Sequence, residues 1–199
     1  MLPERALSIP VALRPFEAAD APRVAALVGE RAVAEMTGLI PHPYPESAAE
    51  AWIAAQVPDR AAGRRYTYAI TPAGDTMVVG AISLRPSPTE REHLGYWIGR
   101  SYWGRGYATA AASTVIALAF TLLDLDRLTA SRLTKNAASG RVLEKCGLKL
   151  LRTEERAHRG MDEAFCVHGL TRDEWLALSD ASAMAPQAAL AAGNSGQIG

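Results

Sequence analysis

The sequence predicts an α/β domain with a mixed α+β sheet, and three observations support this fold class. Short apolar or β-branched runs alternate with helical patterns between residues 11 and 170. Three consecutive runs separated by turn-forming residues are typical of an antiparallel meander. A strand–helix–strand unit follows, and such a crossover usually places binding chemistry at the carboxyl ends of its strands.

The first half of the chain is expected to form one strand, two helices and the meander. The strand covers 11–14 and ends at a proline, and a helix then runs to residue 28 with Asp20 as its N-cap. A second helix starts near Ser47, after a loop broken by prolines. The meander strands are expected at 65–70, 77–84 and 92–98.

The second half begins with a change of period. From residue 106, apolar residues recur at steps of three and four, which predicts one long helix to about Leu123. The remaining elements are expected as a strand at 127–133, a helix at 137–146, strands at 149–156 and 164–169, and a short helix from about 171.

The chain has 199 residues, which suits a single domain. We expect an N-terminal extension at 1–10, the domain at 11–178 and a flexible tail at 179–199. The tail is rich in Ala, Gly, Ser and Gln, a composition that cannot build a core.

Composition excludes several classes of protein. Lys and Arg total 21 and Asp and Glu total 21, and this neutrality argues against a nucleic-acid binder. No apolar run approaches the roughly 18 residues that a membrane span needs, so no membrane partner is expected. Cys146 and Cys166 lack neighbours at metal-ligand spacing, which predicts buried thiols, no metal site and a reducing, cytoplasmic location.

The loop from Gly99 to Thr109 carries the clearest chemical signal. It joins a predicted strand to the long helix, whose N-terminus offers unpaired backbone N–H groups, and Gly104 and Gly106 let an anion approach the main chain. This pattern favours a pyrophosphate. A tight turn that needs positive φ is the simpler alternative. A dinucleotide-binding fingerprint is disfavoured, because Thr109 replaces the third glycine and Asp126 precedes its strand.

Three motifs carry a resemblance to a known family. They are Leu94-Gly-Tyr-Trp-Ile98, Tyr102-Trp-Gly-Arg-Gly-Tyr-Ala-Thr109 and Asn136-Ala-Ala-Ser-Gly-Arg-Val-Leu-Glu-Lys-Cys-Gly147. In this order they resemble the core of the GNAT acetyltransferases, in the RimJ/RimL-like branch of ribosomal-protein N-terminal acetyltransferases. The resemblance implies an acyl-CoA N-acyltransferase fold, with a central, mostly antiparallel sheet, one splayed strand pair and flanking helices.

The resemblance implies acetyl-CoA as the acetyl donor and no metal. The strand before the loop would pair its main chain with the pantetheine arm, and Asn136 would reach the cofactor near the thioester. Trp103 departs from the Gln or Arg that opens the family's loop motif, which favours Arg100 or Arg105 as the charged phosphate contact. The implied cofactor-binding residues are Tyr96, Trp97, Ile98, Arg100, Trp103, Gly104, Arg105, Gly106, Tyr107, Ala108, Thr109, Asn136 and Ser139.

Two residues are the catalytic candidates that the resemblance implies. Ser139 is similar to the serine that this branch places near the sulfur, where it would protonate the thiolate or position the sulfur; capping the helix is its alternative role. His93 stands where the branch usually has Glu and could accept the amine proton, although a strand histidine can also be purely structural. His42, Tyr44 and Glu92 are the candidates for the amine pocket.

These residues support an N-acetyltransferase that uses acetyl-CoA and a primary amine, by direct attack. The acceptor is a protein N-terminus, such as that of a ribosomal protein, or a small amine. A catalytically idle acyl-CoA-binding module is the alternative, and a second copy of the chain stays open as a partner. Residues 95–152 hold nine basic and three acidic side chains, so we expect a positive half for the cofactor and an acidic half for a cationic amine.

Overall fold

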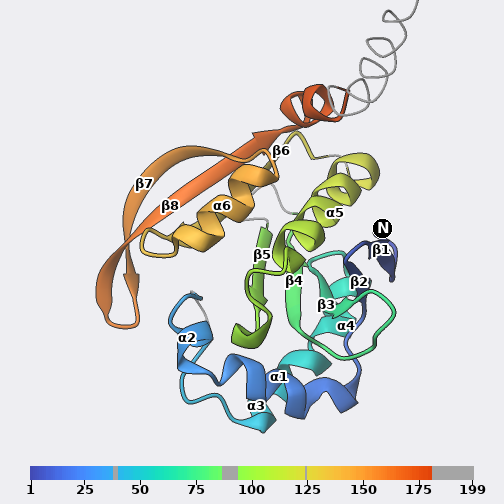
Figure 1. Ribbon diagram of the computed structural model, residues 1–199, viewed down its shortest axis with the longest axis vertical. Helices are drawn as coiled ribbons and strands as arrows, with labels where there is room; N and C mark the ends of the chain where they lie inside the picture. The colour runs from blue at the N-terminus through green and yellow to red at the C-terminus, as the bar shows by residue number, and fades with distance from the viewer. Residues whose placement is uncertain (38–39, 87–93, 124, 181–199) are drawn as a thin grey trace, which may run out of the picture.

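In the computed structural model (Figure 1), eight strands form one sheet in the order β1-β2-β3-β4-β5-β6-β8-β7. The structure describes residues 1–37, 40–86, 94–123 and 125–180. All neighbouring strands are antiparallel except β5 and β6, which are parallel. The predicted mixed α/β fold is therefore confirmed.

The strands and helices have the following bounds. The strands are β1 Ala6–Ser8, β2 Val11–Arg14, β3 Tyr66–Pro72, β4 Gly80–Leu84, β5 Leu94–Ile98, β6 Arg127–Leu133, β7 Lys149–His158 and β8 Met161–Thr171. The α-helices are α1 Ala21–Val28, α2 Arg31–Ala34, α3 Glu46–Ala54, α4 Gln56–Ala61, α5 Tyr107–Leu122 and α6 Ala137–Lys145, with 3₁₀ turns at Ala18–Asp20 and Arg100–Tyr102. Residues 172–180 are also helical.

The N-terminal part of the chain differs from expectation in several details. The short helices α2 and α4 were not predicted, and two further differences concern β1 and Asp20. Strand β1 lies inside the predicted extension 1–10, and it pairs with β2 through Ala6 opposite Leu13. Asp20 stands at the N-cap of α1 but makes no side-chain cap bond. Its carboxylate instead accepts two hydrogen bonds from Arg14, at 2.8 and 2.9 Å, because this mostly buried guanidinium needs a counter-charge. Residues 179 and 180, which were expected to belong to the flexible tail, are helical. From residue 181 onward, the predicted tail lies outside the described residues.

The core lies on both faces of the sheet. Helix α5 packs against β1 to β5, and its small residues Ala111, Ala112 and Ala119 are fully buried there. Helices α1 and α3 pack against each other on the opposite face, away from α5 and α6 (Figure 1). Since side chains alternate along a strand, Tyr96 of β5 packs with the α5 cluster and Trp97 with the α1–α3 cluster. In the described ranges, no helix has the length and apolar character needed to cross a membrane.

The sheet opens between β5 and β6. Within the described residues these strands pair at one position, Leu94 opposite Ala130, while β6 pairs over its whole length with β8. On its other side, β5 pairs with β4 from Leu94 to Ile98. From Tyr96 to Ile98, the edge of β5 that faces β6 is therefore not paired with another strand, as the predicted splayed pair requires.

Candidate active site

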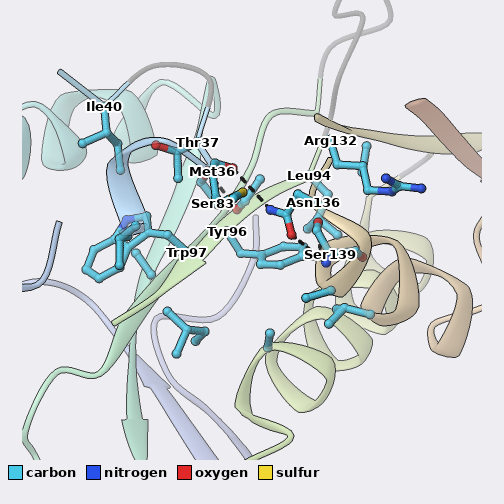
Figure 2. A pocket seen from close by; sticks show the side chains of 18 of the residues that line it. Met36, Thr37, Ile40, Ser83, Leu94, Tyr96, Trp97, Arg132, Asn136 and Ser139 are labelled. Carbon is cyan, nitrogen blue, oxygen red and sulfur yellow. Dashed lines mark hydrogen bonds between the residues drawn. The ribbon is translucent and has the colours of Figure 1, made fainter. Parts of the chain in front are cut away.

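A cavity of about 990 Å³ extends through this opening (Figure 2). This volume lies at the upper end of the range for small-molecule and cofactor sites. Its wall is formed by the loop 102–109, strands β5 and β6, the start of α6, and residues of α1 to α3 and strands β3 and β4. One continuous space therefore joins the glycine loop to the opposite face of the sheet.

The glycine loop has the conformation that its sequence predicts. Gly104 and Gly106 both have a φ of +77°, and Gly106 is the N-cap of α5. A Cβ added at either position would meet no atom within 4 Å, so the backbone conformation, and not crowding, requires glycine here. The loop presents bare main chain beside the N-terminus of a 16-residue helix, an arrangement that suits an anion.

The side chains of this loop close it against β5. The Trp103 indole Nε1 donates to the Ile98 carbonyl oxygen at 2.7 Å, which ties the loop to the end of the strand. The Arg105 guanidinium lies 5.3 Å from the centre of the Tyr102 ring and donates to Ser101 O at 3.2 Å. Arg105 lines the cavity, whereas Arg100 is exposed and is not part of the wall. Of the two predicted arginines, the structure favours Arg105.

Two hydroxyl groups meet on the α6 side of the cavity. The Tyr96 hydroxyl lies 2.9 Å from Ser139 Oγ and 3.2 Å from the Ser139 carbonyl oxygen. Burial raises the pKa of Tyr96 to about 12, so its hydroxyl stays protonated at neutral pH. From the sequence, only the main chain of Tyr96 was expected to contribute to the site. The position of its side chain could have been predicted, because side chains alternate along a strand and Tyr96 therefore points to the face opposite Trp97 (Figure 2).

Asn136 holds the turn that presents Ser139. Its Oδ1 accepts a hydrogen bond from the Ser139 backbone N–H at 3.1 Å, which makes Asn136 the N-cap of α6. Its Nδ2 donates to the carbonyl oxygen of Met36 at 3.4 Å and so bridges the cavity wall (Figure 2). The capping role considered for Ser139 therefore belongs to Asn136, and the Ser139 hydroxyl is left to contact Tyr96.

The opposite side of the cavity is aromatic. Tyr44, Trp52 and Trp97 line it, and the rings of Trp52 and Phe16 pack edge to face at 4.9 Å. Burial raises the pKa of Tyr44, so this phenol is neutral at physiological pH. His42, by contrast, is exposed and does not belong to the wall. Glu92 and His93 lie outside the described residues.

Several polar residues of the wall were not predicted from the sequence, and four of them lie on or beside β3 and β4. Arg65 precedes β3, Thr67 lies in β3, Ser83 lies in β4, and Arg85 follows β4. Along the chain these residues alternate with the core residues Tyr66 and Leu84. This period of two is typical of a strand and could have indicated that they share the face opposite the core residues. Among the described residues that line the cavity, none is Asp or Glu. The described wall therefore does not fit the expectation that acidic side chains surround the cationic amine.

The acetyltransferase (GNAT) domain family matches residues 11–149. The chain belongs to this family. The FsC-acetyl coenzyme A-N(2)-transacetylase of Aspergillus fumigatus is 31% identical over 98 residues, which cover 47% of this chain and 42% of the relative. The chain spans about half the length of the curated relatives it matches.

Solved GNAT structures share the fold. RimL, a ribosomal L7/L12 alpha-N-protein acetyltransferase in complex with coenzyme A, superposes with a TM-score of 0.72 at 16% identity, covering 83% of this chain and 96% of RimL. Mycobacterium smegmatis RimJ, in complex with CoA-disulfide, gives 0.71 at 20% identity, covering 85% of this chain and 89% of RimJ. The GNAT-type fold expected from the three motifs is confirmed.

Cys146 is the remaining reactive group near the GNAT cavity. Burial raises the pKa of its thiol, and its Sγ lies 3.4 Å from the Ser113 hydroxyl. It is not among the residues of the cavity wall. A raised pKa disfavours the thiolate, so this cysteine is better suited to packing than to nucleophilic chemistry.

Proposed function

We propose that this GNAT domain is an acetyl-CoA-dependent N-acetyltransferase in which a primary amine attacks the thioester directly. The observation that carries the proposal is the single cavity that joins the glycine loop to the aromatic face. Two substrates that enter from opposite ends would meet beside Tyr96 and Ser139. Holding two reactants in line removes much of the entropic barrier to their reaction.

The cofactor end of the cavity fits the donor. Backbone N–H groups at the start of α5, together with Arg105, would hold the pyrophosphate. The edge of β5 from Tyr96 to Ile98, which no strand covers on the β6 side, would pair with the amide groups of the pantetheine arm. When bound, acetyl-CoA supplies the thioester carbonyl carbon that the amine attacks.

Ser139 and Tyr96 would supply the proton that the reaction needs. As the N–C bond forms and the C–S bond breaks, the sulfur requires a proton and the amine must lose one. Either hydroxyl can donate in the 2.9 Å contact between Tyr96 and Ser139. With Tyr96 as the donor, the Ser139 proton would be free to be given to the sulfur. An α-amine has a pKa of about 8 and needs only modest help to become neutral. His93 stays the predicted base and Glu92 a predicted acceptor contact.

The names of the relatives point to two kinds of acceptor. The name of RimL specifies the N-terminus of a ribosomal protein, and that of the fungal relative specifies FsC. We therefore keep both a protein N-terminus and a small amine as acceptors for this chain.

Release of free thiol from acetyl-CoA tests the proposal. The assay would contain a panel of N-terminal peptides and small amines, and acetyl-CoA binding would be followed by thermal shift. At about 100 times its Kd, a ligand stabilises a fold by roughly 2.7 kcal/mol. We expect stabilisation and amine-dependent thiol release. Stabilisation without release from any amine would indicate the idle acyl-CoA-binding module, and no stabilisation of a folded sample would overturn both.

A further inference from the structure

We propose that the acceptor amine also carries a carboxylate, and that Arg65 and Arg85 bind it; this inference rests on the proposed function. Tyr66 of β3 pairs with Leu84 of β4 in an antiparallel register, so the next step beyond the end of this pairing brings Arg65 opposite Arg85. Both arginines line the cavity. Like charges placed opposite each other on neighbouring strands are destabilising unless an anion lies between them.

Neither guanidinium is fully neutralised by the described part of the protein. The nearest carboxylate to Arg65 is Asp59, with Oδ2 at 4.0 Å from its Nε, and the same carboxylate already binds Arg64 at 2.8 Å. The Arg65 Nε is buried and has no hydrogen-bond partner there. Arg85 makes no ion pair with a described residue. Two positive charges therefore face a cavity whose described wall has no carboxylate.

A second observation places a ligand beside the arginines. Thr67 is 6% exposed and lines the cavity, yet its hydroxyl has no hydrogen-bond partner in the described structure. Buried hydroxyls almost always have a partner, so this one points to a ligand atom. Ser83 lies directly opposite Thr67 in the sheet and also lines the cavity. Two guanidinium groups and two hydroxyls thus form one polar surface on this face of β3 and β4.

This polar surface lies within reach of the reacting amine. Ser83 pairs with Gly95, the residue before Tyr96. Arg85 directly follows β4 and lies two residues beyond Ser83, about 7 Å at 3.4 Å per residue, and its long side chain can shorten that gap. A carboxylate a few bonds from an amine would span the interval. Nearby positive charge would also lower the pKa of the amine and favour its neutral, nucleophilic form.

Two sources could supply such a carboxylate, a free amino acid or an acidic side chain near the N-terminus of a peptide. Thiol release would be measured with glutamate, with an amidated peptide that begins Ser-Glu, and with the same peptide containing Gln in place of Glu. Glutamate is compared with glutamine amide, and the Ser-Glu peptide with the Ser-Gln peptide. In the pair that represents the natural acceptor, the KM of the charged compound should be at least about tenfold lower than that of the uncharged one. The acceptor that responds identifies the source.

Substitutions of the arginines test the assignment. Arg65→Gln and Arg85→Gln should each raise the KM of the charged acceptor about tenfold, and should leave unchanged the KM of the uncharged acceptor and that of acetyl-CoA. Arg64→Gln is the matched control, because Arg64 also binds Asp59 but does not line the cavity. Thermal stabilisation by acetyl-CoA would verify that each variant is folded.

The outcomes separate this inference from the function on which it rests. Equal KM values for charged and uncharged acceptors would overturn the carboxylate subsite while leaving an N-acetyltransferase. Equal losses on both acceptors in the arginine variants would do the same, since they would indicate a structural role. Absence of thiol release from every amine would overturn the proposed function itself.

Discussion

The two ends of the cavity are built in different ways. The cofactor end comes from two short continuous segments, the loop 102–109 and the turn at the start of α6. The acceptor end is assembled from α1 to α3 and strands β3, β4 and β5, which are distant in sequence. A local segment reveals its chemistry through glycines and helix starts, whereas an assembled surface depends on which strands pair and in what register. The acceptor end is therefore where this protein can differ from its relatives without altering donor binding.

The largest expected effect lies where the two ends meet. Ser139→Ala should lower kcat about 100-fold, because general acid catalysis typically contributes at least this factor, and should leave acetyl-CoA binding intact. Tyr96→Phe should lower kcat less, about tenfold, because Ser139 keeps its own proton. Steady-state kinetics on both substrates checks this.

Ser113→Ala is the control for these variants. It also removes a hydroxyl hydrogen bond, to Cys146, but Ser113 does not line the cavity. Full activity of Ser139→Ala would contradict the role assigned to both hydroxyls. Because the pKa of Tyr96 is raised to about 12, deprotonation of Tyr96 should not lower the wild-type rate between pH 7 and pH 10.

The next effect concerns the cofactor end alone. Gly106→Val places a β-branched residue at a φ of +77°, which costs about 1–2 kcal/mol and adds a side chain where the phosphates would lie. We expect the KM for acetyl-CoA to rise about tenfold or more, with little change in the KM of the acceptor. Gly160→Val, at a φ of +79° in the β7–β8 turn and with equally open surroundings, carries the same strain away from the cavity. If Gly160→Val raised the KM for acetyl-CoA equally, backbone strain and not loss of the phosphate contact would explain the effect of Gly106→Val.

A smaller effect is expected at the acceptor end. Arg159, at the tip of the β7–β8 hairpin, donates to the carbonyl oxygens of Ala34 and Ile40 at 2.7 and 2.5 Å. Ile40 lines the cavity, so Arg159→Ala should raise the KM of the acceptor about fivefold, as expected for roughly 1 kcal/mol, and spare that of acetyl-CoA. Arg152→Ala is the control, because that arginine binds Glu154 within the same hairpin. Equal rises in both KM values would mean that the hairpin supports the whole fold.

Much of the fold was predictable because its signals are local. The alanine stripe of α5 and the glycines at its start identify a helix without knowledge of its neighbours. The hairpin strands β7 and β8 are longer than predicted, because their outer ends are polar and the apolar pattern stops before the pairing does. Strand β1 was missed since it has three residues, of which Leu7 is 70% exposed.

The same distinction explains the outcome for the site. Gly104 and Gly106 act through their own turn, so their place in the loop could be predicted. Asn136 was expected at the cofactor, and its role as the N-cap of α6 was not predicted. Arg65 and Arg85 become neighbours only through the register of β3 and β4. A sequence pattern gives the period of each strand but not which strand lies beside it, and so the polar surface of the acceptor end was not foreseen.

The smallest effect concerns the stability of the fold in acid and a buried histidine of β8. His168 is 1% exposed in β8, and burial lowers the pKa of its imidazole, as does the charge of Arg132, a residue of the cavity wall. The folded state therefore keeps His168 neutral, while the unfolded chain titrates near 6.5. The stability due to this difference is present above pH 6.5 and is lost as pH falls toward the lower folded pKa. His168→Gln should remove part of that acid dependence in denaturant unfolding, whereas His42→Gln, at an exposed position, should not. An unchanged pH dependence in His168→Gln would show that the unfolding transition does not depend on this buried site.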